Sequence, residues 1–574
     1  MKNAEIADAF DELGTLYELD GAIVHRVLAY RNAAKAIREA PGSVAEMASK
    51  GTVTELPGVG KTIAEKIDAL MADGDIPSAV KLRARIPAGL VQVTRIPGLG
   101  PKRARLLHKE LGIDSLEALK TAADAQQLRT VAGFGPKAEE NLLAALAAGA
   151  DGSVARRTVL SAARAIGEEL VASLRQHPAS IRVELAGSAR RFTDSCKDLD
   201  IVASAKDPAA LVEAFAALPA IDEITGPGTS GAKGTTHQGI GVDLRIVPEA
   251  SFGNLLQHFT GSGRHNEALR TAAVKQGIHV SEYGVAIDES ETTHACATEE
   301  EVYELLGMAY IPPELREDRG ELEAARKKAL PALLEVDDIK GDLHSHSIAS
   351  DGHATILEMA RAAQERGYEY LAVTDHSATH GFGNHVTPDE LRKQIERVAK
   401  ANAKLEGFTV LAGTETNILP DGSVDYEDEL LAELDWVVAS VHTSFQMAEA
   451  EMTERIVTVL ESPYVDALGH PTGRLIEQRE PYAVDMDAVI EAAARTGTFL
   501  EINANPKRRD ISDVYARQAV KAGVTIVIDS DAHRPETLDN MRFGVATARR
   551  AWLTKDDVAN TRSWPELQKL RKQR

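Results

Sequence analysis

Histidine and carboxylate residues recur through the last 235 or so residues of this chain, and most of them follow short apolar, β-branched runs. Such runs predict buried parallel strands, and strand ends converge at the mouth of an α/β barrel, so these side chains would share one pocket. His-x-His and Asp-x-His place both side chains on one side of an extended chain. Neutral imidazoles together with carboxylates suit zinc, manganese or iron. The candidate ligands are His344, His346, Asp351, His376, Glu415, His442, His470, Asp531 and His533.

This series resembles the PHP (polymerase and histidinol phosphatase) domain, from about Lys340 to the C-terminus. The resemblance implies a distorted seven-stranded (β/α) barrel with a trinuclear metal site that hydrolyses phosphoesters. Bound metals would acidify a water and clamp the phosphate oxygens. Arg474 and the run Lys507–Arg509 are candidates to meet the substrate's phosphates, with a solvated surface cluster as the equal alternative. By the resemblance, His344, His346, Glu415 and Asp531 hold one ion, Glu415, His442 and His470 a second, and Asp351, His376 and His533 a third.

The length and the charge distribution predict a multidomain protein whose parts differ in net charge. A chain of 574 residues predicts roughly three to five domains. The net charge of −22 is concentrated outside the first 150 residues, which hold about 19 basic and 19 acidic groups. Two cysteines, Cys196 and Cys296, are too few for a disulfide framework. With no apolar run of the roughly 18–20 residues that span a membrane, the composition predicts a soluble, cytoplasmic protein.

A short glycine motif occurs three times near the N-terminus, over Leu56–Lys61, Ile96–Lys102 and Val131–Lys137. Each copy lies between helical patterns, which is typical of the helix-hairpin-helix element. The amides of the hairpin and of the next helix would point at one phosphate and hold DNA without reading its sequence. Plain helix connections are the alternative. The candidate DNA contacts are Gly58, Gly60, Lys61, Gly98, Gly100, Lys102, Gly133, Gly135 and Lys137.

Three aspartates in the middle of the chain form a candidate two-ion site. Asp198 and Asp200 would face one side of a strand, and Asp243 lies in a second predicted strand, Gly239–Val247. Three converging carboxylates hold two Mg²⁺ ions, which organise in-line phosphoryl transfer. The preceding Gly187–Ser188 suits close backbone approach to a triphosphate. This combination is the nucleotidyltransferase pattern.

Further motifs resemble the family X DNA polymerases, over about residues 1–316. The resemblance implies that residues 1–85 hold gapped DNA and its 5′-phosphate, 86–150 grip the duplex, 151–250 form the palm, and 251–316 select the nucleotide. Residues 317–338 would be a linker and 339–574 the PHP domain. The motifs are Ala29–Arg31, Leu56–Gly60, Gly187–Arg191, Asp198–Asp200, Val242–Arg245, Phe259–Ser262, His265–Asn266, Glu282–Gly284 and Tyr310–Arg316.

Two segments of the polymerase part carry specific predictions of secondary structure. A helical pattern covers Val154–Gln176 and leads into a strand, Ile181–Leu185. The charged stretch Glu314–Asp338 would be the linker or, equally, a helix packed on the barrel.

The same resemblance assigns roles to individual residues. Asp198 and Asp200 would bind both metals, and Asp243 would bind the catalytic one and help deprotonate the primer hydroxyl. The candidate nucleotide contacts are Ser188, Arg191 and Lys233 at the triphosphate, Phe259 and Gly261 at the sugar, and Asn266 and Arg270 at the nascent base pair.

Two positions are less simply carried over. His258 stands where the family commonly has tyrosine, so discrimination against ribonucleotides is not carried over to this position from the resemblance. Lys66 matches the lysine that forms a Schiff base in relatives with 5′-deoxyribose-phosphate lyase activity. A lysine at this point of the helix is also a simple phosphate contact, which is the interpretation we favour.

Together these patterns predict a multidomain α+β and α/β enzyme that fills short gaps in DNA during repair. The expected cofactors are two Mg²⁺ or Mn²⁺ ions in the palm and up to three Mn²⁺ or Zn²⁺ ions in the barrel. The expected partners are gapped or primed DNA and deoxynucleoside triphosphates, and no membrane. We expect a monomer in the cytoplasm that associates with the nucleoid. The barrel would be an Mn²⁺-dependent 3′–5′ exonuclease, with an abasic-site endonuclease and a 3′-phosphatase as alternatives. The alternatives are a polymerase with a purely structural barrel and a nucleotidyltransferase that is not a polymerase.

Overall fold

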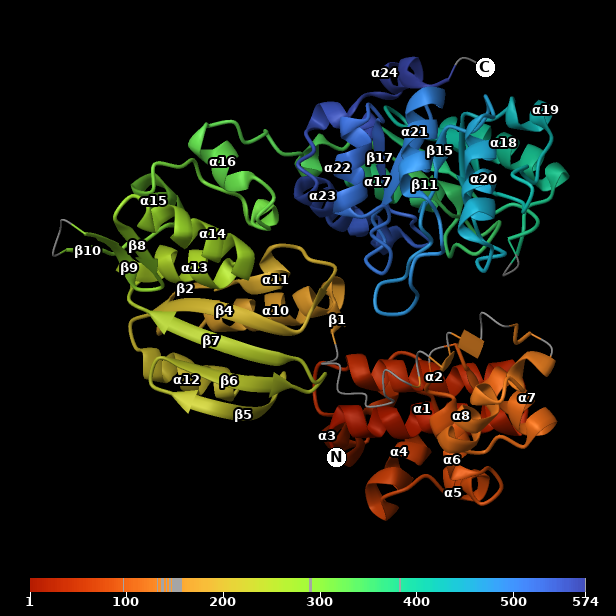
Figure 1. Cartoon of the computed structure of the whole chain (residues 1–574), viewed down its shortest axis with the longest axis horizontal. Helices are drawn as coiled ribbons and strands as arrows, with labels where there is room; N and C mark the ends of the chain where they lie inside the picture. The colour runs from red at the N-terminus through yellow and green to blue at the C-terminus, as the bar shows by residue number, and fades with distance from the viewer. Residues whose placement is uncertain are drawn as a thin grey trace. The chain divides into compact units, whose positions relative to one another are not determined.

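The computed structural model describes residues 1–574 apart from residues 97, 132, 136–138, 141, 144–145, 147–156, 289–291, 381–383 and 573–574. The chain folds as two compact units, whose helices and strands are labelled in Figure 1. The first unit comprises Met1–Arg157, Arg164–Glu184 and Lys197–Val247; the second comprises Thr158–Ala163, Leu185–Cys196 and Pro248–Arg574. None of the helices in the described part of the chain is long and apolar enough to cross a membrane.

Short helices make up the N-terminal part of the first unit. Their apolar residues recur every three or four positions, as Ile6, Phe10 and Leu13 do in α1, and this spacing puts them on one buried face. Helix α1 ends at Gly21, whose φ of 84° favours glycine. The helices are α1 (Asn3–Asp20), α2 (Val24–Glu39), α3 (Val44–Lys50), α4 (Lys61–Asp73), α5 (Pro77–Arg83), α6 (Ala88–Val93), α7 (Pro101–Leu111) and α8 (Leu116–Asp124).

A five-stranded sheet with the order β2-β4-β7-β6-β5 forms the rest of the first unit. Strands β4 and β7 are parallel, whereas β6 pairs antiparallel with both β5 and β7. The apolar centre of β4, Ile201–Ala203, is fully buried, as expected of an interior strand that lies between β2 and β7. The elements are β2 (Ser180–Leu185), β4 (Asp198–Ala205), α12 (Pro208–Ala216), β5 (Ile221–Gly228), β6 (Gly231–Thr236) and β7 (Gly241–Val247).

The helix predicted over 154–176 is confirmed only in part. Helix α10 runs from Leu160 to Arg175, and Thr158–Val159 instead form strand β1. Strand β1 pairs antiparallel with β3, Ser195–Cys196, so its backbone groups are satisfied by strand pairing rather than by a helical turn. Residues 154–156 lie outside the described residues.

The second unit includes residues 251–316, the segment predicted to select the nucleotide. A buried carboxylate, Glu299, accepts hydrogen bonds from Arg190 and Arg316, both at 2.6 Å. In the stretch predicted as a linker, α16 inserts Ala325 into the apolar cluster of this subdomain. The elements are α11 (Gly187–Arg190), α13 (Phe252–Thr260), α14 (Gly263–Val274), β8 (Ile278–Ser281), β9 (Gly284–Ile287), β10 (Thr293–His294), α15 (Glu299–Leu305) and α16 (Glu321–Arg326).

Seven parallel strands form the predicted barrel in the C-terminal part of the second unit. They follow one another in sequence order, and a bridge between Ser345 and Ala532 connects the first strand's end to the chain after the last strand. The parallel arrangement explains the continuous apolar runs in the sequence, because these strands are covered on both faces. The strands are β11 (Gly341–Ser345), β12 (Tyr370–Val373), β13 (Thr409–Asn417), β14 (Trp436–Ser440), β15 (Ala467–Leu468), β16 (Phe499–Asn503) and β17 (Ile526–Asp529).

Alternate strand residues fill two separate layers of the barrel. Leu371 and Val373 join the cluster under the outer helices, whereas Tyr370 and Ala372 join an inner cluster with Trp436. Leu567 of the last helix packs into the inner cluster, so apolar side chains fill that part of the barrel. The helices are α17 (Ile356–Glu365), α18 (Pro388–Asn402), α19 (Asp428–Leu431), α20 (Glu449–Leu460), α21 (Met486–Thr496), α22 (Asp513–Lys521), α23 (Met541–Arg550) and α24 (Trp564–Leu567).

Candidate active sites

The structure brings all nine candidate ligands of the barrel to the carboxyl ends of its strands. Glu415 continues the inward-facing row that begins with Leu411 on β13, since residues two apart share a face. The other ligands lie near the ends of their strands or in the loops that follow them. The prediction that these residues share one pocket is therefore correct.

Glu415 lies at the middle of the cluster and is 1 % exposed. Its Oε1 is 2.9 Å from His470 Nε2 and 3.2 Å from His442 Nε2. Its Oε2 is 2.8 Å from His376 Nδ1 and 3.3 Å from His344 Nε2. One carboxylate thus faces four imidazoles, which is the arrangement expected of a ligand shared between ions.

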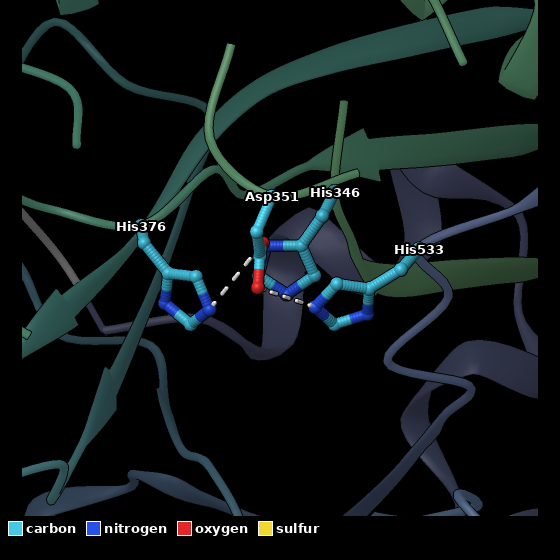
Figure 2. A group of neighbouring side chains, drawn as sticks. All are labelled: His346, Asp351, His376 and His533. Atoms are coloured by element: carbon cyan, nitrogen blue, oxygen red, sulfur yellow. Dashed lines mark ion pairs between the residues drawn. The ribbon is translucent and has the colours of Figure 1, made fainter. Parts of the chain in front are cut away.

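Figure 2 shows the group at the outer side of the cluster, around Asp351. The Asp351 carboxylate lies 3.2 Å from His533 Nε2 and 3.7 Å from His376 Nε2, and His346 completes the group. Within each of three groups the ligand atoms lie within 4.8 Å of one another: His346, Asp351, His376 and His533; His344, His346 and Asp531; and His376, Glu415 and His442.

These side chains fit divalent metal ions. The Nδ1 atoms of His346 and His470 are buried and make no hydrogen bond to other protein atoms, and the Oε2 of Glu415 faces the imidazole nitrogens of His376 and His344. Buried polar atoms normally have partners, so a cluster of such atoms calls for a cation. The mixture of imidazole and carboxylate donors suits Mn²⁺ or Zn²⁺.

Two buried acids that we did not single out from the sequence hold the ligands in place. Glu501 accepts a hydrogen bond from His344 Nδ1 at 2.6 Å and another from the His470 backbone N–H at 2.5 Å. The imidazole is thereby oriented with Nε2 toward the cluster, as in many carboxylate–histidine–metal arrangements. Asp375 accepts hydrogen bonds from Ser347 N and Ser350 Oγ and so shapes the loop that carries Asp351. An acid inside the apolar run Phe499–Asn503 was the available signal for Glu501.

The charges within the cluster shift the pKa values of its side chains, so that protons occupy positions where metal ions would bind. Burial alone would raise the pKa of Glu415, but the imidazoles of His442 and His376 hold it well below its usual range. Burial alone would lower the pKa of His533, but its contacts with Asp351 and Asp531 raise it to about 9. A metal ion that takes His533 as a ligand must therefore displace a proton.

The arginines proposed to meet substrate phosphates separate into two kinds. Arg474 donates a hydrogen bond to Asp194 at 2.8 Å, and Arg509 is buried 3.3 Å from the same carboxylate. Both are engaged in the packing of the second unit. Arg508 instead places Nε 3.7 Å from Asp531 Oδ2, beside the cluster. Of that set, Arg508 is the better placed candidate for a substrate contact.

The palm aspartates lie on neighbouring strands of the five-stranded sheet. The register pairs Asp200 of β4 with Asp243 of β7, and Asp198 lies two residues before Asp200, so the three share a face. Asp243 makes ion pairs with Lys233 at 3.2 Å and with Arg245 at 2.9 Å. Asp200 and Asp243 are half-buried, and Asp198 is exposed.

Candidate nucleotide contacts in the second unit are partly engaged with the protein. Arg191 donates hydrogen bonds to Glu317 at 3.0 Å and to the Thr260 carbonyl at 2.5 Å. Asn266 is buried, with its amide bonded to Gln257 and to the His258 carbonyl. The remaining candidates lie around the same helices: Ser188 in α11, Phe259 in α13, Gly261 at the end of α13 and Arg270 in α14.

The hairpins have the backbone shape that the glycine motif predicted. Gly58, Gly98 and Gly133 have φ of 79°, 84° and 86°, values that favour glycine. Gly60 and Gly100 directly precede α4 and α7, so Lys61 and Lys102 lie in the first turns of those helices and are exposed. These helix N-termini leave backbone amides available for a phosphate.

The third glycine motif and Lys66 supply the other candidate DNA contacts. Gly135 lies within the third glycine motif, and the predicted contact Lys137 lies outside the described residues. Lys66 places Nζ 3.2 Å from Ser78 Oγ and 6.0 Å from the centre of the Tyr30 ring.

Family models match four stretches of the chain. They are described as a helix-hairpin-helix domain (residues 1–76), a SAM-like helix-hairpin-helix tandem (91–148), a DNA polymerase beta thumb (255–317) and a PHP domain (342–505). The fold and these matches define the class: a polymerase of the polymerase-beta type joined to a PHP domain.

The chain belongs to the PolX family. It is 38% identical to the "DNA polymerase/3'-5' exonuclease PolX" of Bacillus subtilis over 570 residues, covering 99% of each chain. The C-terminal part is also 35% identical over 204 residues to a probable phosphatase of Caldanaerobacter subterraneus, covering 33% of this chain and 75% of that protein. A probable phosphatase of a Thermoanaerobacter species is 32% identical over 240 residues, with 38% and 89% covered.

Proposed function

We propose that this PolX-family protein fills short gaps in DNA with its palm and hydrolyses DNA from the 3′ end with its barrel. The observation that carries the proposal is the presence of two separate acidic sites. Three aspartates share one face of the palm sheet, and nine ligand candidates cluster at the barrel mouth. The relative from Bacillus subtilis, which spans the whole chain, bears a name that combines the same two activities.

In the palm, the three aspartates would hold two Mg²⁺ or Mn²⁺ ions. Asp198 and Asp200 would ligate both ions, and Asp243 the catalytic one. Such a pair stabilises the attacking and leaving oxygens of an in-line displacement. Lys233, which pairs with Asp243, would turn to the triphosphate once ions neutralise the carboxylate.

On the nucleotide side, Ser188 and Arg191 would hold the triphosphate after Arg191 leaves Glu317. Phe259 and Gly261 would lie at the sugar, and Asn266 and Arg270 at the nascent base pair. The hairpins around Gly58 and Gly98 would hold the two sides of a gap through backbone amides. Lys66 would contact the 5′-phosphate.

In the barrel, the nine ligands would hold up to three Mn²⁺ or Zn²⁺ ions, with Glu415 shared between two. Bound ions supply an acidified water and neutralise phosphate charge. Arg508, near Asp531, would bind a phosphate oxygen. An abasic site or a 3′-phosphate is a second candidate substrate, because the barrel alone resembles probable phosphatases.

The complete set of candidate ligands argues against a purely structural barrel, since a support would need no buried cluster of imidazoles around one carboxylate. The hairpins argue against a small-molecule nucleotidyltransferase, since a small substrate requires no grip on a duplex. We expect the chain to act as a monomer beside chromosomal DNA.

The test is incubation of gapped DNA with Mg²⁺ or Mn²⁺, with and without nucleotides, for the intact chain and two variants. We expect Asp198→Ala to abolish extension and keep 3′–5′ hydrolysis, and His344→Ala to do the reverse. Hydrolysis lost in Asp198→Ala and kept in His344→Ala would contradict the assignment of the nuclease to the barrel.

A further inference from the structure

A groove of about 490 Å³ lies in the barrel between the loop after β11 and helix α18. Part of its wall is formed by Ser347, Ile348 and Ala349, which follow the ligand candidate His346 and precede Asp351. We propose that this groove binds the single DNA strand whose end is hydrolysed at the metal centre. This inference rests on the proposed nuclease function and names the part of the substrate that the barrel recognises.

Hydrogen bonds connect the groove to the metal centre on two sides. Ser347 donates through its backbone N–H and its hydroxyl to Asp375, which precedes His376 in the chain. On the other side, Val386 of the groove wall donates its N–H to the His376 carbonyl at 3.0 Å. Both walls of the groove are therefore fixed to segments that present metal ligands.

The metal centre is most accessible next to this loop. Asp351 is 26% exposed and His533 is 30% exposed at the side chain, whereas Glu415 is 1% exposed. A substrate must therefore approach from the side of Asp351. The loop 347–349 lies directly before that residue, so a strand that leaves the centre here meets the groove.

The groove combines an apolar wall with cations, which matches a nucleic acid strand. Ile348 is 57% exposed, although large apolar side chains are usually buried, and Val386 extends the apolar wall. Arg397, Lys400 and Lys404 line the side formed by α18 and the residues that follow it. Bases offer apolar faces and the backbone offers one negative charge per nucleotide, so a strand complements both walls.

The carboxylate in the groove pairs with one of these cations, Arg397, and leaves Lys400 and Lys404. Glu390 lines the groove and is already paired with Lys393 at 2.6 Å and with Arg397 at 3.1 Å. Lys400 has an exposed contact with Glu396 at 3.7 Å, which is weak in water. Lys400 and Lys404 can therefore bind the phosphates of a strand.

The length of the groove selects for a strand rather than a small ester. From Glu390 to Lys400 helix α18 rises by about 15 Å, because each residue adds about 1.5 Å. A stacked strand advances about 3.4 Å per nucleotide, so the span corresponds to about four nucleotides. A small phosphate ester at the metal centre would not reach Lys400 or Lys404. The barrel should therefore favour oligonucleotides over small phosphoesters.

The first test measures Mn²⁺-dependent hydrolysis by the full chain with the double variant Lys400→Glu/Lys404→Glu. The substrates are thymidine oligonucleotides of two to eight nucleotides and bis(4-nitrophenyl) phosphate. The matched control is Arg361→Glu/Arg392→Glu, which makes the same charge change on exposed residues of α17 and α18 outside the groove. We expect KM for the octamer to rise about tenfold at an unchanged kcat, with a weaker salt dependence.

The small diester should be hydrolysed at the same rate by all three proteins, because it does not extend into the groove. An unchanged KM for the octamer, or an equal change in the control, would overturn the proposal. If the double variant also loses the small-diester activity, the single variant Lys404→Gln is measured in its place. The same outcomes then decide.

A second test does not depend on catalysis and so separates this proposal from the nuclease function. Cys196 and Cys296 are buried, so Lys404→Cys provides an accessible thiol. An octamer with a disulfide tether at its fifth nucleotide is incubated with this variant in EDTA, with Arg392→Cys as the control. Severalfold more crosslink with Lys404→Cys supports the groove even if no hydrolysis is found. Equal crosslinking would overturn it.

Discussion

The barrel and the palm both bring acidic side chains together for divalent ions, but the two sites differ in the burial and the ion pairing of these side chains. In the barrel, Glu415 is buried and lies against four imidazoles. In the palm, Asp243 is half-buried and held by Lys233 and Arg245. Desolvated, mutually oriented ligands favour resident ions, whereas a carboxylate paired with cations must release them first. We therefore expect the barrel ions to stay with the protein and the palm ions to arrive with the nucleotide.

The largest effect should follow removal of a palm aspartate. We expect Asp243→Ala to reduce primer extension by more than about a thousandfold, because the catalytic ion would lose a ligand and the charges of Lys233 and Arg245 would no longer be neutralised. Hydrolysis by the barrel should change less than about twofold. Single-nucleotide insertion on gapped DNA measures the first and Mn²⁺-dependent hydrolysis the second.

Asp222→Ala is the matched control, since Asp222 lies on β5 of the same sheet and pairs with Lys2 and His237 instead. Normal extension by Asp243→Ala would remove the palm assignment.

An equivalent change in the barrel should remove the metal as well as the activity. We expect Glu415→Gln to reduce hydrolysis by about a thousandfold and to lower the metal content after gel filtration, because one neutral amide cannot bridge ions. Extension should persist. Elemental analysis is compared with Glu451→Gln, an exposed position on α20. Full metal content in Glu415→Gln would contradict a bridging role.

A buried carboxylate held by two arginines, Glu299, tests what buried charge contributes away from the candidate metal sites. Burial alone would raise the pKa of Glu299, but Arg316 and Arg190 hold it at about 2. The stabilisation is present above the unfolded pKa of about 4.5 and is lost as pH falls toward 2. Glu299→Gln should cost about 3 kcal/mol at pH 7.

That cost should shrink below pH 4.5, where the unfolded carboxylate is already protonated. Denaturant unfolding at pH 7 and pH 3.5 measures the change, with Glu300→Gln, at the exposed neighbouring position, as the control. An equal cost at both pH values would mean that charge is not what Glu299 contributes.

Glu501 should matter less than the ligands that it orients. We expect Glu501→Gln to weaken Mn²⁺ binding by about 10- to 100-fold, because His344 loses a charged partner that fixes its orientation. Titration of the metal-free chain with Mn²⁺ reports this without any assay of hydrolysis. Affinity within twofold of the unchanged protein would show that packing alone orients His344.

The smallest effect is expected at the hairpins, where backbone amides share the phosphate contact. Lys102→Glu should weaken binding to duplex DNA by about three- to tenfold for every sequence, and lower the slope of log K against log salt by about one. Lys120→Glu, on the exposed side of α8, is the control. A loss that depends on base sequence would contradict backbone recognition.

Much of the site could be predicted because its residues follow short sequence patterns that determine local backbone structure. The apolar runs before His376, Glu415 and His442 proved to be parallel strands, and their ends meet as the barrel geometry requires. The first glycine of each hairpin, Gly58, Gly98 or Gly133, adopts the positive φ that the motif indicates. In the palm, the period of two put Asp198 and Asp200 on one face.

What the sequence by itself determined is the set of candidate ligands, the order of the strands and the family to which the chain belongs. Only the tertiary structure decided which charges are available. Arg474 and Arg509 look like phosphate binders in the sequence but are engaged by Asp194, more than 200 residues earlier in the chain. The role of Glu501 is not evident from its apolar run and becomes clear only in the fold, where its carboxylate contacts His344. The reason is that the energy of a charge depends on its neighbours and its distance from water, and both are fixed only by packing.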